Sequence, residues 1–204
     1  MPGMTKLTHR LAGSLETLAQ ALRRYGRDDG KVLVLGGVRS GKSRHAERLV
    51  AHHPRLVYVA PGLPPSAEDP EWAARVEAHR ARRPHHWTTI ETTDLATVLR
   101  NATSPLLIDC LGTWLSRVLD EVGAWTGEPG WELRLDDRLE DFLAAWGQAR
   151  VPVVAVSNEV GSGVVPATVS GRLFRDVLGA LNNRVSADCD RVALIVAGRV
   201  LALP

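Results

Sequence analysis

The apolar residues of the chain fall into short runs that alternate with segments of helical periodicity. The runs predict strands at residues 31–36, 55–60, 87–91, 105–110, 151–156, 191–197 and 199–203. Helical patterns cover residues 42–52, 71–83, 94–101, 111–122, 131–148 and 171–187. Strands that alternate with helices predict an α/β fold, with a mostly parallel sheet, helices on both faces and a C-terminal hairpin.

Before the first strand, leucines recur at helical spacing and polar residues lie between them. We expect the resulting amphipathic helix, over residues 5–25, to pack on the domain or on a partner subunit. The chain is therefore divided into a helical extension at residues 1–30 and one domain at residues 31–204. The leucines of the stripe are Leu7, Leu11, Leu15, Leu18 and Leu22.

Composition narrows the class of protein. The length of 204 residues suits one compact domain, and 45% hydrophobic with 24% charged residues is typical of a globular protein. A formal net charge of +2 gives no sign of a nucleic-acid or membrane surface. No apolar run reaches the roughly 20 residues that span a bilayer, and two cysteines are too few for a disulfide scaffold. Because a secretory signal is also missing, we expect a cytoplasmic protein.

The segment between the first strand and the next helix matches the phosphate-binding pattern G-x-x-x-x-G-K-[ST]. Its glycines let backbone N–H groups converge on phosphate oxygens. We expect the lysine to reach the β- and γ-phosphates and the serine hydroxyl to bind Mg²⁺. A site for a purine nucleoside triphosphate is therefore predicted at Gly36, Gly37, Val38, Arg39, Ser40, Gly41, Lys42 and Ser43.

A phosphate loop usually has an acidic partner at the end of a neighbouring strand. Asp109 ends the apolar run at residues 106–108, where it is placed to hold Mg²⁺ directly or through water. Aspartate also caps helices, and the next helix is predicted to begin near Leu111. The two roles are compatible, and we favour the metal role.

His79 is a candidate nucleophile within the predicted helix at residues 71–83. Arg75 lies four residues before it on the same face, and Arg82 and Arg83 lie about one turn after it. Because positive neighbours disfavour a second charge, we expect an uncharged, nucleophilic imidazole, with the arginines holding a phosphate chain. The alternative, which these residues alone favour, is an ordinary solvated helix face.

A glycine-containing loop at residues 157–170 follows the strand at 151–156, on the phosphate-loop side of the sheet. Asn158 and Glu159 offer an amide and a carboxylate to a second substrate, although a plain turn or hinge is equally compatible. Arg172 and Arg175 on the following helix form either an anion clamp or surface ion pairs, which are the commoner outcome.

Together these segments resemble the bifunctional adenosylcobinamide kinase / adenosylcobinamide-phosphate guanylyltransferase family. The resemblance implies a RecA-like P-loop NTPase fold and a homo-oligomer, with a trimer expected. Gly112, Ala167-Thr168 and Asn183 depart from the family pattern. The resemblance is carried by GGVRSGKSRHAE at residues 36–47, RVEAHRARRPHHW at 75–87, LLIDCLGTWL at 106–115, and SNEVGSGVVP with RLFRDVLGALNNRVSA between 157 and 187.

The resemblance also implies a function in cobalamin biosynthesis. Such an enzyme phosphorylates adenosylcobinamide with ATP or GTP, then transfers GMP from GTP to adenosylcobinamide phosphate, giving adenosylcobinamide-GDP. The guanylylated residue of the family's R-[IV]-x-x-H-x-x-x-R-P motif corresponds to His79, and Lys42 would neutralise the departing pyrophosphate. By the same resemblance, the base and ribose sites involve Ala60, Pro61, Gly62, Arg80, Ala81, Arg82, Arg83, Glu91 and Asp109.

Two other functions remain open at this point, and neither forms a covalent intermediate. One is a small P-loop metabolite kinase. The other is a GTPase-like switch, because residues 109–112 read D-x-x-G, although the chain lacks the N-K-x-D that would select guanine.

Overall fold

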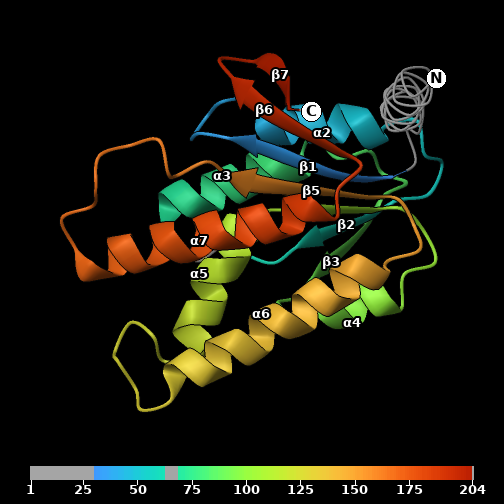
Figure 1. Ribbon diagram of the computed structural model, residues 1–204. Coiled ribbons are helices and arrows are strands. Elements are labelled where there is room, and N and C mark those ends of the chain that lie inside the picture. Colours follow the sequence, from blue (N-terminus) through green and yellow to red (C-terminus); the bar gives the residue numbers. More distant parts are fainter. Residues whose placement is uncertain (1–29, 63–68, 204) are drawn as a thin grey trace, which may run out of the picture.

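The computed structural model describes residues 30–62 and 69–203, apart from the side chain of Arg75. The described residues form one seven-stranded sheet in the order β3-β2-β4-β5-β1-β6-β7, with helices on both faces (Figure 1). The strands are β1 (Lys31–Gly36), β2 (Val57–Ala60), β3 (Thr88–Glu91), β4 (Leu106–Asp109), β5 (Val153–Asn158), β6 (Arg191–Val196) and β7 (Arg199–Leu203). The helices are α2 (Lys42–Val50), α3 (Pro70–Arg80), α4 (Leu95–Arg100), α5 (Leu111–Glu121), α6 (Trp131–Gln148) and α7 (Val169–Ala187).

All neighbouring strands run parallel except β6 and β7, which pair antiparallel. The predicted α/β class and the terminal hairpin are therefore confirmed. Parallel pairing brings the carboxyl ends of β1, β2, β4 and β5 to one edge of the sheet, which is where ligands bind in folds of this kind.

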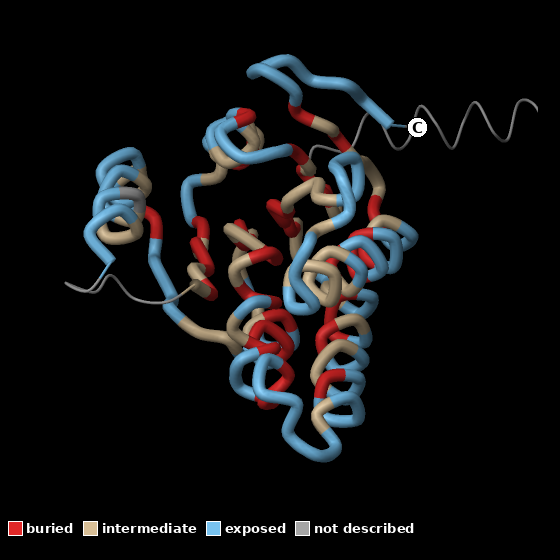
Figure 2. The backbone as a smooth tube through the Cα atoms, turned by 90° about the vertical axis from the view of Figure 1, so that its left-hand side faces the viewer, coloured by how far each residue is buried: buried red, intermediate tan, exposed pale blue. Residues whose placement is uncertain are grey.

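The core has two layers, one on each face of the sheet, and the buried segments in Figure 2 follow the strands and the inner sides of the helices. Leu33 and Ile108 pack with residues of α4, α5, α6 and α7 on one face, whereas Val34 and Leu107 pack with α2 on the other. Strands covered on both faces must be apolar at successive positions, which accounts for the continuous apolar runs in the sequence.

Several predicted boundaries were wrong by one to three residues, two of them in segments that carry candidate site residues. The helix predicted over residues 71–83 ends at Arg80, because Pro84 disfavours helical geometry at the residue before it. The fifth strand begins after Pro152 and continues through Ser157 and Asn158, which pair with Leu35 and Gly36 of β1. The helix predicted over residues 5–25 lies outside the described residues.

Candidate nucleotide site

The predicted phosphate loop forms a sharp turn between β1 and α2. Arg39 and Gly41 adopt positive φ angles of 57° and 93°, and glycine is favoured in such a conformation. At Gly36, a Cβ would lie 2.4 Å from the Ser40 hydroxyl oxygen, so the turn has no room for a side chain there. The Lys42 ammonium donates to the carbonyl oxygen of Gly37 at 3.1 Å. Since α2 begins at Lys42, its positive dipole end faces the loop, as an anion site requires.

Neighbouring strands fix the two sides of this loop. The backbone N–H of Gly198, in the turn of the β6–β7 hairpin, donates to the carbonyl oxygen of Ser40 at 2.9 Å. The backbone N–H of Glu159 donates to the carbonyl oxygen of Gly36 at 3.1 Å. The loop is therefore held by the segments that follow β5 and β6, in addition to its own strand and helix.

Asp109, at the end of β4, is the centre of the polar contacts beside the loop. The Ser43 hydroxyl donates to its Oδ1 at 3.2 Å, and the Tyr58 hydroxyl donates to its Oδ2 at 2.9 Å. Burial alone would raise the pKa of Asp109, but interactions with His79, Tyr58 and Ser43 outweigh it and hold that pKa below its usual value. The helix-cap position before α5 is taken by Cys110 and not by Asp109.

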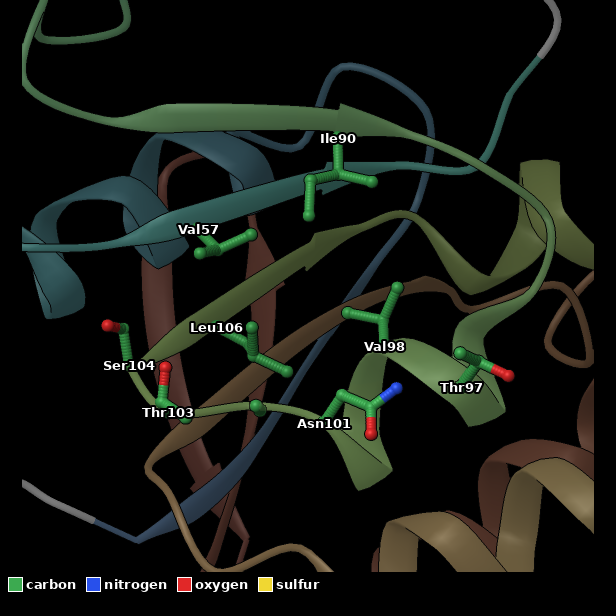
Figure 3. A pocket seen from close by; sticks show the side chains of 9 residues that line it. Val57, Ile90, Thr97, Val98, Asn101, Thr103, Ser104 and Leu106 are labelled. Carbon is green, nitrogen blue, oxygen red and sulfur yellow. The ribbon is translucent and has the colours of Figure 1, made fainter.

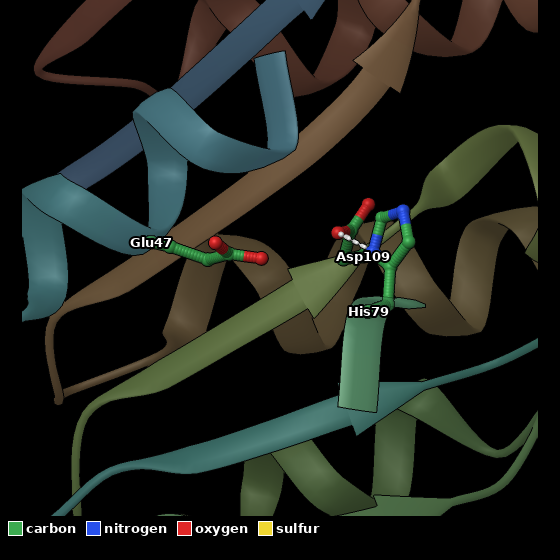
Figure 4. A group of neighbouring side chains, drawn as sticks. All are labelled: Glu47, His79 and Asp109. Atoms are coloured by element: carbon green, nitrogen blue, oxygen red, sulfur yellow. Dashed lines mark ion pairs between the residues drawn. The ribbon is translucent and has the colours of Figure 1, made fainter. Parts of the chain in front are cut away.

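His79 lies in the last turn of α3 and faces the same carboxylate. Its Nδ1 is 3.6 Å from Asp109 Oδ2, and the Glu47 carboxylate completes a group whose ligand atoms all lie within 4.8 Å of one another (Figure 4). We expected the arginines around His79 to hold a phosphate chain. Instead, Arg80 pairs with Glu91 at 2.5 Å and Arg82 pairs with Glu47 at 3.2 Å, so carboxylates already hold these two guanidinium groups.

Tyr58 and Glu47 are residues of this cluster that the sequence reasoning missed. The guanidinium carbon of Arg83 lies 3.6 Å from the centroid of the Tyr58 ring, a cation–π contact. The Nη1 of the same arginine donates to the Thr89 hydroxyl at 3.3 Å. Burial, and then the Asp109 charge, raise the pKa of Tyr58 well above its usual value, so it remains a hydrogen-bond donor. Glu47 had a usable signal, because it lies four residues after Ser43 on the same face of α2.

The side chains beside Lys42 suit a magnesium ion. The Ser43 hydroxyl and the Asp109 carboxylate offer oxygen ligands 3.2 Å apart, and Glu47 adds a second carboxylate nearby. Mg²⁺ prefers oxygen ligands of this kind, held by few protein groups next to phosphates. The residues present therefore fit the ion that a nucleoside triphosphate carries.

The other predicted site residues lie at the same edge of the sheet. The polar side chains of several of them already form hydrogen bonds or ion pairs within their own segments. Ala60 and Glu91 end β2 and β3, and Asn158 ends β5. The Glu159 carboxylate accepts from the backbone N–H groups that follow it in its own loop, at 2.7 and 3.1 Å. Further along the chain, Arg172 donates to the carbonyl oxygens of Pro166 and Ala167, and Arg175 pairs with Asp176 at 3.0 Å.

A hollow of about 270 Å³ lies at the opposite end of the strands (Figure 3). Val57 and Leu106, the first residues of β2 and β4, form part of its wall with Val98 of α4. The residues that line it carry no charge, and the phosphate loop is not among them. The carboxyl edge, and not this hollow, is therefore the candidate nucleotide site.

A comparison with known protein families shows to which family the chain belongs. The family model for cobinamide kinase / cobinamide phosphate guanyltransferase matches residues 32–203. The chain belongs to this family. It is 38% identical over 176 residues to the bifunctional adenosylcobalamin biosynthesis protein CobU of Salmonella typhimurium, covering 82% of this chain and 96% of that protein. It is 40% identical over 176 residues to the bifunctional protein CobP of Pseudomonas aeruginosa, covering 84% of this chain and 95% of that one.

Solved structures support the predicted RecA-like P-loop NTPase fold. A prototypical ATPase from the type III secretion system of pathogenic bacteria superposes with a TM-score of 0.51 at 14% identity. The match covers 85% of this chain but only 56% of that ATPase, and it shows the fold alone. Within the described part of the chain, no helix combines the length and the apolar character that crossing a membrane requires.

Proposed function

We propose that this enzyme phosphorylates adenosylcobinamide and then transfers GMP from GTP to the product through a guanylyl-histidine intermediate at His79. One observation carries the proposal: the His79 imidazole lies across the Asp109 carboxylate from Ser43, the last residue of the phosphate loop. A triphosphate held by that loop therefore has a nucleophilic side chain close to its phosphate chain. Such an arrangement suits transfer of the nucleotidyl group as well as transfer of the terminal phosphate.

The orientation of His79 indicates which ring nitrogen attacks. Because Nδ1 faces Asp109, the neutral imidazole that carries its proton on Nδ1 has its lone pair on Nε2. In the proposed step, Nε2 forms a bond to the α-phosphorus of GTP and the bond from that phosphorus to the bridging oxygen breaks. Pyrophosphate leaves, Lys42 neutralises its charge, and Asp109 stabilises the cationic ring that results.

The second half of the transfer regenerates the histidine. A phosphate oxygen of adenosylcobinamide phosphate attacks the phosphorus of guanylyl-His79, the P–N bond breaks, and adenosylcobinamide-GDP is released. In the kinase reaction, the substrate hydroxyl attacks the γ-phosphorus of ATP or GTP and loses its proton to solvent. The bond from that phosphorus to the β–γ bridging oxygen breaks, and the nucleoside diphosphate leaves from the same loop. Mg²⁺ held by Ser43 and Asp109 would supply charge neutralisation on the phosphates in both reactions.

The remaining residue roles in this proposal follow from their places around the loop. The ends of β2 and β3, with Arg80, Arg82 and Arg83, would contact the base and ribose of the nucleotide. Asn158 and Glu159 would face the corrinoid, together with Arg172 and Arg175. We also expect a homo-oligomer, with a trimer as the predicted state, and a cytoplasmic location.

The covalent intermediate is tested by intact-protein mass spectrometry after incubation with GTP and Mg²⁺, without any corrinoid. We expect an acid-labile adduct of one GMP on the wild type and none on His79→Ala. His86→Ala is the matched control, because His86 is an exposed histidine on the segment after α3, and it should carry the adduct. An adduct on His79→Ala, or none on the wild type, would contradict the proposed intermediate and favour a kinase or a switch.

The kinase reaction is tested separately with adenosylcobinamide and γ-labelled ATP. We expect His79→Ala to transfer the label to the corrinoid, because the imidazole is needed only for guanylylation. Lys42→Ala should lose both reactions. A switch would release labelled phosphate to water and leave the corrinoid unlabelled.

A further inference from the structure

The C-terminal hairpin presents an apolar surface that none of the described residues covers. Val196, Leu201 and Leu203 are large apolar residues that remain between 38% and 58% exposed. Figure 2 shows the end of β6 and all of β7 as exposed chain at the rim of the molecule. An exposed apolar edge strand invites association or aggregation, so natural proteins normally cover one.

The pairing register shows that these side chains share one face. Leu194 is opposite Leu201, and Val196 is opposite Arg199. Residues directly opposite each other point to the same side of the sheet, and successive residues alternate. We call the side chains of Leu194, Val196, Leu201 and Leu203 the leucine face. The alternate β6 residues, such as Ile195, point to the other side, where they are buried in the layer with α2.

We propose that the leucine-striped segment at residues 5–25 of the same chain docks on the leucine face. The first argument is the place where this segment joins the domain. The backbone N–H of Lys31 donates to Asp190 at 2.9 Å, and Asp190 directly precedes β6. Two residues further on, Val192 is opposite Leu203. The segment therefore leaves the domain two strands from β7, the far strand of the leucine face, a separation of about 10 Å.

The second argument is length. Residues 26–29 span up to about 13 Å when extended, which exceeds that separation. A helix over residues 5–25 is about 31 Å long. Strand β7 has 5 residues, or about 17 Å, so the helix is long enough to cover the whole strand.

The third argument is that residues 5–25, and not a second copy of the protein, are the favoured occupant of the leucine face. The helix predicted from the sequence would carry its five leucines on one face, and it would then need an apolar partner as much as the hairpin does. The family model begins at residue 32, which puts the stripe outside the pattern that the family shares. Because the segment is tethered beside the face, its effective concentration there is in the millimolar range, which favours it over a second copy.

The test measures how fast a maleimide labels a cysteine placed on the leucine face. Leu201→Cys is introduced into the full chain, and the labelled sites are mapped by peptide mass spectrometry, because Cys110 and Cys189 are also present. The stripe is then disrupted with Leu11→Asp and Leu15→Asp. We expect labelling of the new cysteine to become at least about 10-fold faster, since a docked helix protects what it covers.

Matched controls separate docking from a general change in the protein. His9→Asp with Gln20→Asp adds the same charge on the opposite side of the predicted helix and should leave the labelling rate unchanged. Leu133→Cys on α6, where Leu133 is 72% exposed, supplies the reference rate in every background. Leu203→Cys is a second probe of the face.

Two results would overturn the proposal. Equal labelling of the leucine face with intact and disrupted stripes would show that the segment does not cover it. Protection that disappears when the protein is diluted would show that a second copy covers it. Neither result bears on the nucleotide reaction, because the leucine face contains none of the residues proposed for that site.

Discussion

Replacement of Tyr58 by phenylalanine isolates one hydrogen bond of the site cluster. Tyr58 is 1% exposed, and its hydroxyl donates to Asp109 Oδ2 at 2.9 Å. Phenylalanine keeps the ring volume and the contact with Arg83, so neither a cavity nor a new charge is created. Whatever changes in the Tyr58→Phe variant can therefore be assigned to the lost donor.

The expected cost is set by the charge and burial of the acceptor. The Asp109 side chain is only 6% exposed, so water cannot freely replace the lost donor. A hydrogen bond to a charged group contributes about 1.5–3 kcal/mol, and we expect the free energy of unfolding to fall by that amount at pH 7. With a urea dependence of about 2 kcal/mol/M, the unfolding midpoint should fall by about 1 M.

The pH dependence follows from the lowered pKa of Asp109. A carboxylate with a lowered pKa in the folded state stabilises that state above its unfolded pKa, and this contribution is lost as the pH falls through the folded value. Tyr58 is one of the groups that lower this pKa, so the variant should have a smaller shift. The difference between wild type and variant should therefore be largest at neutral pH and narrow below about pH 4.

The assay is urea unfolding followed by tryptophan fluorescence, with the wild type, Tyr58→Phe, Asp109→Ala and the double variant as a thermodynamic cycle. We expect the hydroxyl to contribute little once the carboxylate is absent. A cost below about 0.5 kcal/mol at pH 7, the level typical of a surface substitution, would refute this account. So would an equal cost of Tyr58→Phe in the Asp109→Ala background.

Two further predictions concern the loop and a helix end. Gly36→Ala should destabilise the fold by about 1–3 kcal/mol, because its Cβ would lie 2.4 Å from the Ser40 hydroxyl oxygen, whereas Gly37→Ala, which meets nothing within 4 Å, should cost less than about 0.5 kcal/mol in the same unfolding assay. Asp94→Ala removes the acceptor for the Thr97 N–H at the start of α4 and should cost about 1 kcal/mol at pH 7. That cost should become smaller in acid, since the pKa of Asp94 is lowered and the stabilisation from its charge is lost as the pH falls through that value; a cost that stays constant with pH would contradict a charged cap.

Much of the fold could be predicted because buried parallel strands leave a strong signal. Apolar runs as short as residues 31–36 and 106–108, each followed by a helical pattern, are typical of strands that are covered on both faces. The strand order was beyond prediction, since β1 pairs with β5 and β6, which are far from it in sequence. Ser157 and Asn158 are residue types typical of loops, yet their backbone pairs with β1. The prediction therefore ended this strand two residues too early.

The site was predicted less completely, for reasons that differ between residues. The phosphate loop has a pattern of its own, and Asp109 was found from its place after an apolar strand. Tyr58 lies in an apolar strand and looks like an ordinary core residue, because nothing in the sequence shows that its hydroxyl meets a carboxylate. The arginines near His79 were expected to hold a phosphate chain, but Arg82 and Arg80 pair with Glu47 and Glu91 through contacts that only the tertiary structure creates.

The contacts of Asp109 are compatible with both roles proposed for it in the reaction, which are to hold Mg²⁺ and to orient the His79 ring. Its Oδ1 faces Ser43 and its Oδ2 faces Tyr58 and His79, so the proposed binding of Mg²⁺ and orientation of the imidazole would use different oxygens of one side chain. Under the proposed mechanism, the kinase reaction would need only the first oxygen, whereas guanylylation would need both. Loss of His79 should therefore separate the two activities, and loss of Asp109 should remove both of them. On this proposal the carboxylate, more than the histidine, would be the group that both reactions share.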